Sequence, residues 1–137
     1  MEKMEPIFDL HERTFRFAAQ ITKYVRTFPR DVVGFEYGKQ LIRCGSSPGS
    51  NYEEADECAS LKDFIYKMRT CLKEAKETRY WLRLSQAAFG ETDLNTWLLN
   101  EVSELIKIFN SRLAKAIKRN KPEESNDDES APSALLP

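Results

Sequence analysis

The sequence predicts an all-α fold: an antiparallel, up-down-up-down four-helix bundle with a kinked second helix. Apolar side chains recur at steps of three and four residues in four separate stretches, which is the spacing of one helix face. No stretch shows the apolar–polar alternation of a half-buried strand. Glycine (5) and proline (6) are scarce among the 137 residues, so four long helices joined by short links suit the chain.

The first helix is expected over residues 9–28. The helix ends before Pro29, because the proline ring disfavours a helical conformation in the residue in front of it. Its predicted inner face consists of Leu10, Thr14, Phe17, Ile21, Tyr24 and Phe28.

The second helix is expected over residues 31–56, with Asp31 as its N-terminal cap. Gly45, Pro48 and Gly49 are each costly inside a helix, so a helix, a loop and a short second helix form the alternative. The polar side chains nevertheless keep helical phase across Pro48. This phase favours one continuous helix with a kink at the proline.

The third helix is expected over residues 60–89. Ser60 and Asp63 match a capping box, in which the hydroxyl accepts a backbone N–H of the first turn and the carboxylate reaches back. Gly90 is a natural stop signal at the other end.

The fourth helix is expected over residues 93–120 and completes a bundle domain over residues 1–121. Residues 122–137 form an acidic tail that contains proline and serine and is expected to be disordered. Residues 1–121 hold all 21 lysines and arginines and 17 of the 22 acids, a formal charge of +4. The tail holds five acids and no base, a charge of −5. The net charge of −1 therefore hides a mildly basic body.

No apolar run approaches the roughly 20 residues that cross a membrane. The first residues also lack the basic-then-apolar order of a signal peptide. We therefore expect a cytoplasmic protein with no membrane partner. Cys44, Cys58 and Cys71 are odd in number and form no CxxC pair, which predicts free thiols packed as small apolar residues.

A candidate polar network, or a seam between subunits, combines residues of the second and third helices. Its seven members are Arg43, Ser47, Asn51, Glu54, Glu74, Glu77 and Trp81. The first four are spaced four, four and three residues apart, which places them on one helical face. An arginine facing carboxylates, with serine and asparagine completing the hydrogen bonds, is typical of a structural polar network.

The carboxylates also permit a second hypothesis, an enzyme with a metal or carboxylate site formed by Glu54, Glu74, Glu77 and Glu101. Di-iron sites in bundles use Glu-x-x-His pairs. The only histidine, His11, lies near the start of the first helix, where we expect it to be exposed. No serine or cysteine has a plausible histidine partner. We therefore predict no catalytic residue, no bound metal and no cofactor.

Basic residues are frequent along the third helix and are candidates for contact with nucleic acid. They are Lys62, Lys67, Arg69, Lys73, Lys76, Arg79 and Arg83. Several lie three or four residues from Glu74 or Glu77, so part of this surface is expected to form salt bridges. Four aromatic residues could serve as platforms on which nucleic-acid bases stack, but their helical spacing favours the core or an interface: Tyr80, Trp81, Trp97 and Phe109.

Residues 40–84 carry two blocks that resemble a known family. The first is Arg43 followed by Ser47-x-Gly49-x-Asn51-x-x-Glu54, and the second combines Lys73-Glu74, Glu77-Thr78 and Trp81-Leu82. Together they resemble the bacterial four-helix-bundle proteins first noticed as open reading frames in intervening sequences of 23S ribosomal RNA genes. The resemblance covers about residues 9–120, and Glu101-x-x-Glu104-Leu105 resembles the last block of the family.

This resemblance implies an antiparallel four-helix bundle that assembles into a homopentamer. It also points to a relative, the accessory variability protein of diversity-generating retroelements, which is a basic pentamer that binds nucleic acid and a reverse transcriptase. The family supplies no established catalytic residues. We therefore expect a non-enzymatic, oligomeric module with RNA or a reverse transcriptase as partner. A carboxylate-dependent enzyme and a pure protein–protein scaffold remain the alternatives.

Overall fold

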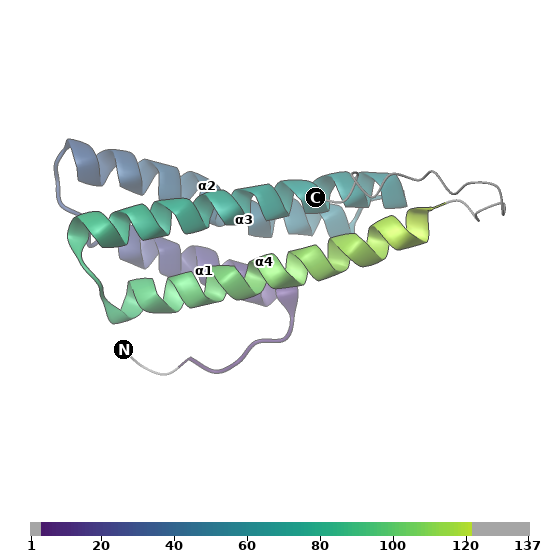
Figure 1. The fold of residues 1–137 in the computed structure, drawn as a ribbon, viewed down its shortest axis with the longest axis horizontal. Helices are drawn as coiled ribbons and strands as arrows, with labels where there is room; N and C mark the ends of the chain where they lie inside the picture. Colours follow the sequence, from purple (N-terminus) through teal and green to yellow (C-terminus); the bar gives the residue numbers. More distant parts are fainter. Residues whose placement is uncertain (1–3, 122–137) are drawn as a thin grey trace.

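Four helices follow one another in the computed structural model, which describes residues 4–121 (Figure 1). They are α1 (Leu10–Val25), α2 (Val32–Asp56), α3 (Leu61–Phe89) and α4 (Asp93–Asn120). Each helix packs against the next one in the chain, and α1 also packs against α4. This closed order confirms the predicted up-down-up-down bundle, and no strand occurs between residues 4 and 121.

Side-chain caps define where the helices begin. Asp31 accepts the backbone N–H of Gly34 at 2.8 Å, as predicted. Ser60 accepts the backbone N–H of Asp63 at 3.1 Å, but the reciprocal half of the predicted capping box is not formed. The complete capping box lies at α4, where the Thr92 and Asn95 side chains each accept the backbone N–H of the other residue.

Helix α1 ends at Val25, three residues before the predicted end. The backbone N–H groups of residues 27 and 28 bond to carbonyls three residues earlier, so the chain tightens into a turn ahead of Pro29. Phe28 still packs on the core, in an edge contact with Tyr24 and a tilted contact with Phe89.

Helix α2 is continuous through Pro48, as the helical phase of its polar residues predicts. Its glycines lie where α1 approaches. A Cβ atom at Gly45 would lie 3.0 Å from the side chain of Ile21, and one at Gly49 would lie 3.2 Å from Oγ1 of Thr14. The glycines that count against a helix in propensity therefore permit the close packing of α1 on α2. A bend of the helix axis at Pro48 stays a prediction.

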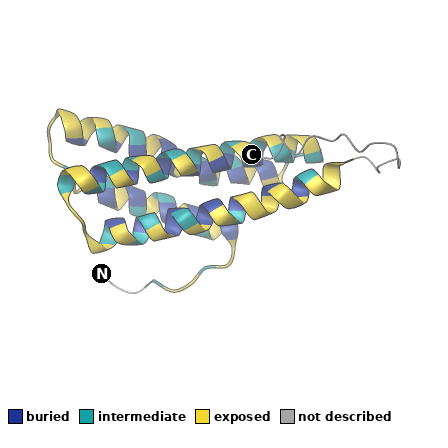
Figure 2. Cartoon of the chain, in the orientation of Figure 1, coloured by how far each residue is buried: buried dark blue, intermediate teal, exposed yellow. Residues whose placement is uncertain are grey.

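The core lies between the four helices, and the exposed residues lie on their outer faces (Figure 2). Each helix contributes fully buried side chains, among them Phe17, Leu41, Met68, Leu98 and Phe109. Cys44 and Cys71 are buried free thiols, and burial raises their pKa values to about 11 and about 12, so both stay protonated at neutral pH. No helix in the described part of the chain is long and apolar enough to cross a membrane.

Candidate functional site

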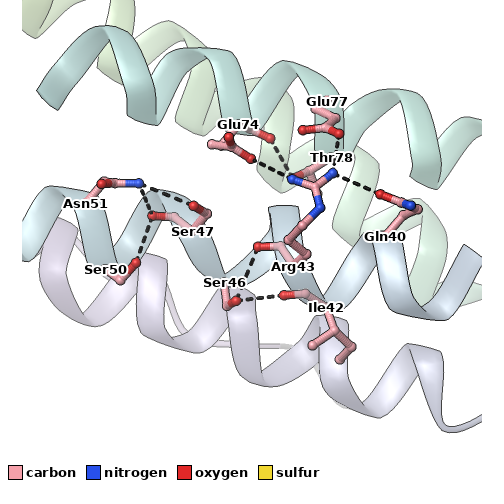
Figure 3. A network of polar contacts seen from close by, with 10 residues as sticks. All are labelled: Gln40, Ile42, Arg43, Ser46, Ser47, Ser50, Asn51, Glu74, Glu77 and Thr78. Atoms are coloured by element: carbon pink, nitrogen blue, oxygen red, sulfur yellow. Dashed lines mark hydrogen bonds and ion pairs between the residues drawn. The ribbon is translucent and has the colours of Figure 1, made fainter. Parts of the chain in front are cut away.

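Arg43 connects α2 to α3 (Figure 3). Its Nη2 donates to a carboxylate oxygen of Glu77, and its Nη1 lies 3.5 Å from Oε2 of Glu74. Nη2 also donates to Oε1 of Gln40, about one turn earlier on α2, at 2.9 Å. The side chain of Arg43 is half-exposed, whereas that of Glu74 is mostly buried. The contact between Arg43 and the two glutamates is therefore buried on the side of Glu74 and open to solvent on the side of Arg43.

Burial and charge shift the pKa values of the two carboxyls in opposite directions. The hydrogen bond from Arg43 lowers the pKa of Glu77. Burial raises the pKa of Glu74, and the neighbouring charge of Glu77 adds to the rise. Glu77 is therefore the anion that holds Arg43, and Glu74 is the easier of the two carboxylates to protonate.

Of the other predicted members of the network, only Trp81 joins the cluster around Arg43. Nδ2 of Asn51 donates to the backbone oxygen and the hydroxyl of Ser47, at 3.1 and 3.2 Å, within α2 itself. Glu54 pairs with Nζ of Lys67 on α3 at 3.3 Å. Trp81 packs on the ring of Tyr37 on α2, with centroids 5.6 Å apart, and its hydrogen bond with Glu77 adds to the lowering of that carboxyl's pKa by Arg43. Arg43, Glu74, Glu77 and Trp81 thus form one cluster between α2 and α3, while Ser47 with Asn51 and Glu54 with Lys67 form separate contacts. A seam between subunits stays a prediction.

The four carboxylates named for an enzyme site do not form one cluster. Glu54, Glu74 and Glu77 are held by basic side chains where α2 meets α3. Glu101 is buried on α4 and faces α1, where Nε and Nη2 of Arg13 donate to its two oxygens at 2.8 and 2.9 Å. Among residues 4–121, no group of three or more histidine, cysteine, aspartate or glutamate side chains is placed to hold a metal ion.

His11 is partly buried, in contrast to the exposed position that the sequence predicts. Its Nδ1 lies 2.9 Å from Oε1 of Glu53, and its Nε2 lies 2.9 Å from Oδ2 of Asp56. Both partners are acceptors, so both contacts are satisfied only by the imidazolium with two N–H donors. These hydrogen bonds, that with Asp56 first, raise the pKa of His11. The ring also packs on Tyr52, which ties the start of α1 to the end of α2.

Five of the seven basic residues predicted to contact nucleic acid are exposed on one face of α3: Lys62, Arg69, Lys73, Lys76 and Arg83. In the described part of the chain, none of these five forms an ion pair, because Glu74 and Glu77 are turned toward Arg43. The remaining two lie off this face. Lys67 pairs with a carboxylate of α2, and Arg79 is partly buried.

Two tyrosines lie on the same face, between the basic residues. Tyr80, which the sequence places in the core or in an interface, is 59% exposed and so lies outside the core of the single chain. Tyr66, which sequence reasoning missed, is 69% exposed. The seven positions are separated alternately by four and three residues, a regular spacing that could have revealed Tyr66. We call them the α3 stripe: Lys62, Tyr66, Arg69, Lys73, Lys76, Tyr80 and Arg83. No acid occupies any of these positions, so the stripe carries five positive charges.

A second exposed surface, the α1–α2 face, is apolar. Phe15 of α1 is 70% exposed and Ile42 of α2 is 41% exposed. They flank a shallow hollow lined by Phe15, Ala18, Ala19, Ile21, Thr22, Ile42 and Ser46. None of these residues is charged, although charged residues make up 31% of the chain. An exposed apolar surface of this kind is typical of a contact with another protein.

The fold and these surfaces define a four-helix bundle whose basic and apolar surfaces both lie on outer helix faces. The chain belongs to the 23S rRNA-intervening sequence protein family, whose sequence model matches residues 8–111. It is similar to a crystal structure of a protein of unknown function from the S23 ribosomal protein family of Bacteroides thetaiotaomicron. The two chains are 32% identical with a TM-score of 0.69, and the similarity covers 75% of this chain and 96% of the other. No curated protein matches. The family expected from the two sequence blocks is therefore confirmed.

Proposed function

We propose that this chain is a non-enzymatic, homo-oligomeric accessory module of the cytoplasm that binds RNA through the α3 stripe. The observation that carries the proposal is the stripe itself. It presents five basic side chains on one exposed face, and none of them forms an ion pair within residues 4–121. Lysine and arginine side chains displayed in this way bind the phosphates of a nucleic-acid backbone. A reverse transcriptase is a further candidate partner, by resemblance to the accessory variability protein.

Two observations favour self-association as part of the same proposal. The α1–α2 face supplies an uncharged surface that a second copy of the chain can cover. Assembly also multiplies the number of stripes, so a body with a formal charge of only +4 can build up a strong positive field. A homopentamer is the assembly that we propose, on the basis of the family resemblance.

RNA binding is tested by fluorescence anisotropy with a labelled, unstructured 20-nucleotide RNA over a series of salt concentrations. Affinity should fall as salt rises, with a log–log slope of roughly −0.7 per phosphate contacted. The double variant Lys73→Gln/Lys76→Gln should lower the magnitude of the slope by about 1.4, since two contacts are lost. The matched control Lys115→Gln/Lys118→Gln removes the same charge from exposed positions on α4. An equal effect of both variants would reject the stripe as the binding surface.

Oligomeric state is tested by light scattering of the full chain. We expect a mass several times the 15.9 kDa of one chain. The variant Phe15→Glu should shift the mass toward that of one chain while the helical circular dichroism is kept. Ala114→Glu, which places the same charge at an exposed position on α4, is the control. A monomer at micromolar concentration would reject the oligomer, and an oligomer that binds no RNA would favour a protein scaffold.

A further inference from the structure

The α3 stripe places aromatic and basic side chains in one row. From Tyr66 to Tyr80, the row contains a tyrosine, three basic residues (Arg69, Lys73 and Lys76) and a second tyrosine. All five are exposed, and Leu72 forms part of a shallow hollow among the three basic residues. Figure 2 shows exposed positions recurring along the whole of α3. The two rings are therefore attached to the same surface as the charges.

Helix geometry sets the spacing of the two rings. They lie fourteen residues apart, which corresponds to about 21 Å along a helix with a rise of 1.5 Å per residue. A repeat of seven residues drifts by about 20° around a straight helix. Over two repeats, the rings thus differ in direction by about 40° and still point to the same side of the bundle. A strand of several nucleotides can therefore contact both rings and the basic side chains between them.

The rings differ from the other aromatic residues of the helix in their exposure. Phe64, Trp81 and Phe89 are partly buried, and Phe64 and Trp81 pack against the core. Tyr66 and Tyr80 stay 69% and 59% exposed, although Tyr80 is held by an edge contact with the ring of Trp81. Core packing thus accounts for the positions of Phe64 and Trp81. It leaves most of the rings of Tyr66 and Tyr80 available to a ligand.

Phosphate contacts alone do not favour a single strand over a duplex, because both present backbone phosphates and the duplex carries the higher charge density. Aromatic side chains do distinguish them. The bases of a duplex are stacked on one another, whereas unpaired bases can stack on tyrosine rings. An alternation of exposed tyrosines and basic residues therefore favours a single-stranded ligand.

We propose that the α3 stripe selects single-stranded nucleic acid, with Tyr66 and Tyr80 stacking on unpaired bases and Arg69, Lys73 and Lys76 contacting the phosphates between them. This inference rests on the proposed function, since it concerns the same surface. It adds the class of ligand, which is an unpaired stretch or loop and not a duplex.

The test compares the full chain and its variants on a labelled 12-nucleotide unstructured RNA and on a 12-base-pair RNA duplex at one salt concentration. Tyr66→Leu and Tyr80→Leu remove the aromatic face but keep an apolar side chain and helix propensity. Each should weaken binding of the single strand by roughly five- to one hundredfold, the usual effect of losing one stacked base. Duplex binding should stay unchanged, and Tyr80→Phe should bind both ligands as the parent chain does.

Two controls separate this inference from the function on which it rests. Lys73→Gln should weaken binding of both ligands, and Phe8→Leu, which removes a 93% exposed aromatic ring just before α1, should weaken neither. If the parent chain binds neither ligand at low salt, both the proposed function and the selectivity are wrong. If it binds both ligands and the tyrosine variants leave single-strand binding intact, or weaken both ligands equally, the selectivity alone is overturned.

Discussion

Replacing Glu101 by leucine should destabilise the bundle, because it removes the shared counter-charge of two arginines. The Glu101 side chain is 8% exposed and accepts two hydrogen bonds from Arg13, and Nη2 of Arg16 lies 4.0 Å from one of its oxygens. The two arginine side chains are themselves about four-fifths buried. The substitution therefore leaves two guanidinium groups in a poorly hydrated place without the anion that they share, and among the described residues only the charge of Glu104 still acts on Arg13.

The size of the effect follows from burial. Removing one member of a fully buried ion pair costs about 3–5 kcal/mol. Each arginine keeps roughly a fifth of its side chain in contact with water and can turn its charged head outward, so the expected loss is smaller, about 2–3 kcal/mol. Arg13→Leu should cost about 3 kcal/mol, since the carboxylate that it leaves behind is more deeply buried than either arginine.

Urea unfolding followed by circular dichroism measures both losses, at one fixed chain concentration because assembly would add to apparent stability. The double variant Arg13→Leu/Glu101→Leu should be more stable than the sum of the single losses predicts, by about 1–3 kcal/mol. Additive losses would show that the two side chains are not coupled. A loss below about 0.5 kcal/mol for Glu101→Leu would refute the argument from buried charge altogether.

Three further predictions concern separate parts of the chain. The single His11 gives one set of imidazole signals in a proton NMR titration, and its pKa should lie above 6.5 and fall in Asp56→Asn. Because folding raises this pKa, the hydrogen bonds of His11 stabilise the fold below about pH 6.5. Their contribution is lost as pH rises through the pKa of His11 in the folded chain. A pKa at or below 6.5 would contradict the geometry. Gly34→Ala should lower stability by roughly 2 kcal/mol in urea unfolding despite the better helix propensity of alanine, since the new Cβ would lie 1.8 Å from the carbonyl oxygen of Pro29; equal stability would show that the turn can move freely. Replacing the five acids of residues 123–129 by their amides should tighten RNA binding at low salt and have little effect at high salt; unchanged anisotropy at low salt would show that the tail does not act on the stripe.

Local signals account for the helix boundaries that the sequence predicts correctly. Asp31 and Ser60 act within the first turn that they cap, and a stop at Gly90 needs no tertiary partner. The early end of α1 is a different case, because Phe28, in the turn before Pro29, packs on Phe89 of α3 as well as on Tyr24 of α1. Contacts of that kind depend on the fold and cannot be predicted from one stretch of sequence alone.

Spacing within a helix predicts which residues share a face, but not which neighbour that face meets. Arg43 and Glu77 meet because α2 and α3 pack side by side, whereas Ser47 and Asn51 meet within one helix. The same limit explains the two basic residues that leave the stripe. Lys67 and Arg79 lie on α3 as well, but at a different angle around the helix axis. Which angles face solvent depends on which residues of α3 are buried in the bundle.

The row of glycines on α2 has a consequence for how the chain opens. Gly34, Gly38, Gly45 and Gly49 each weaken the isolated helix by about 1 kcal/mol relative to alanine, so α2 has little helical tendency without α1 against it. Separation of the two helices should therefore also unwind α2. The α2 amides should then exchange their hydrogens together, in one opening event of high free energy. No intermediate with a detached but still helical α2 should be seen.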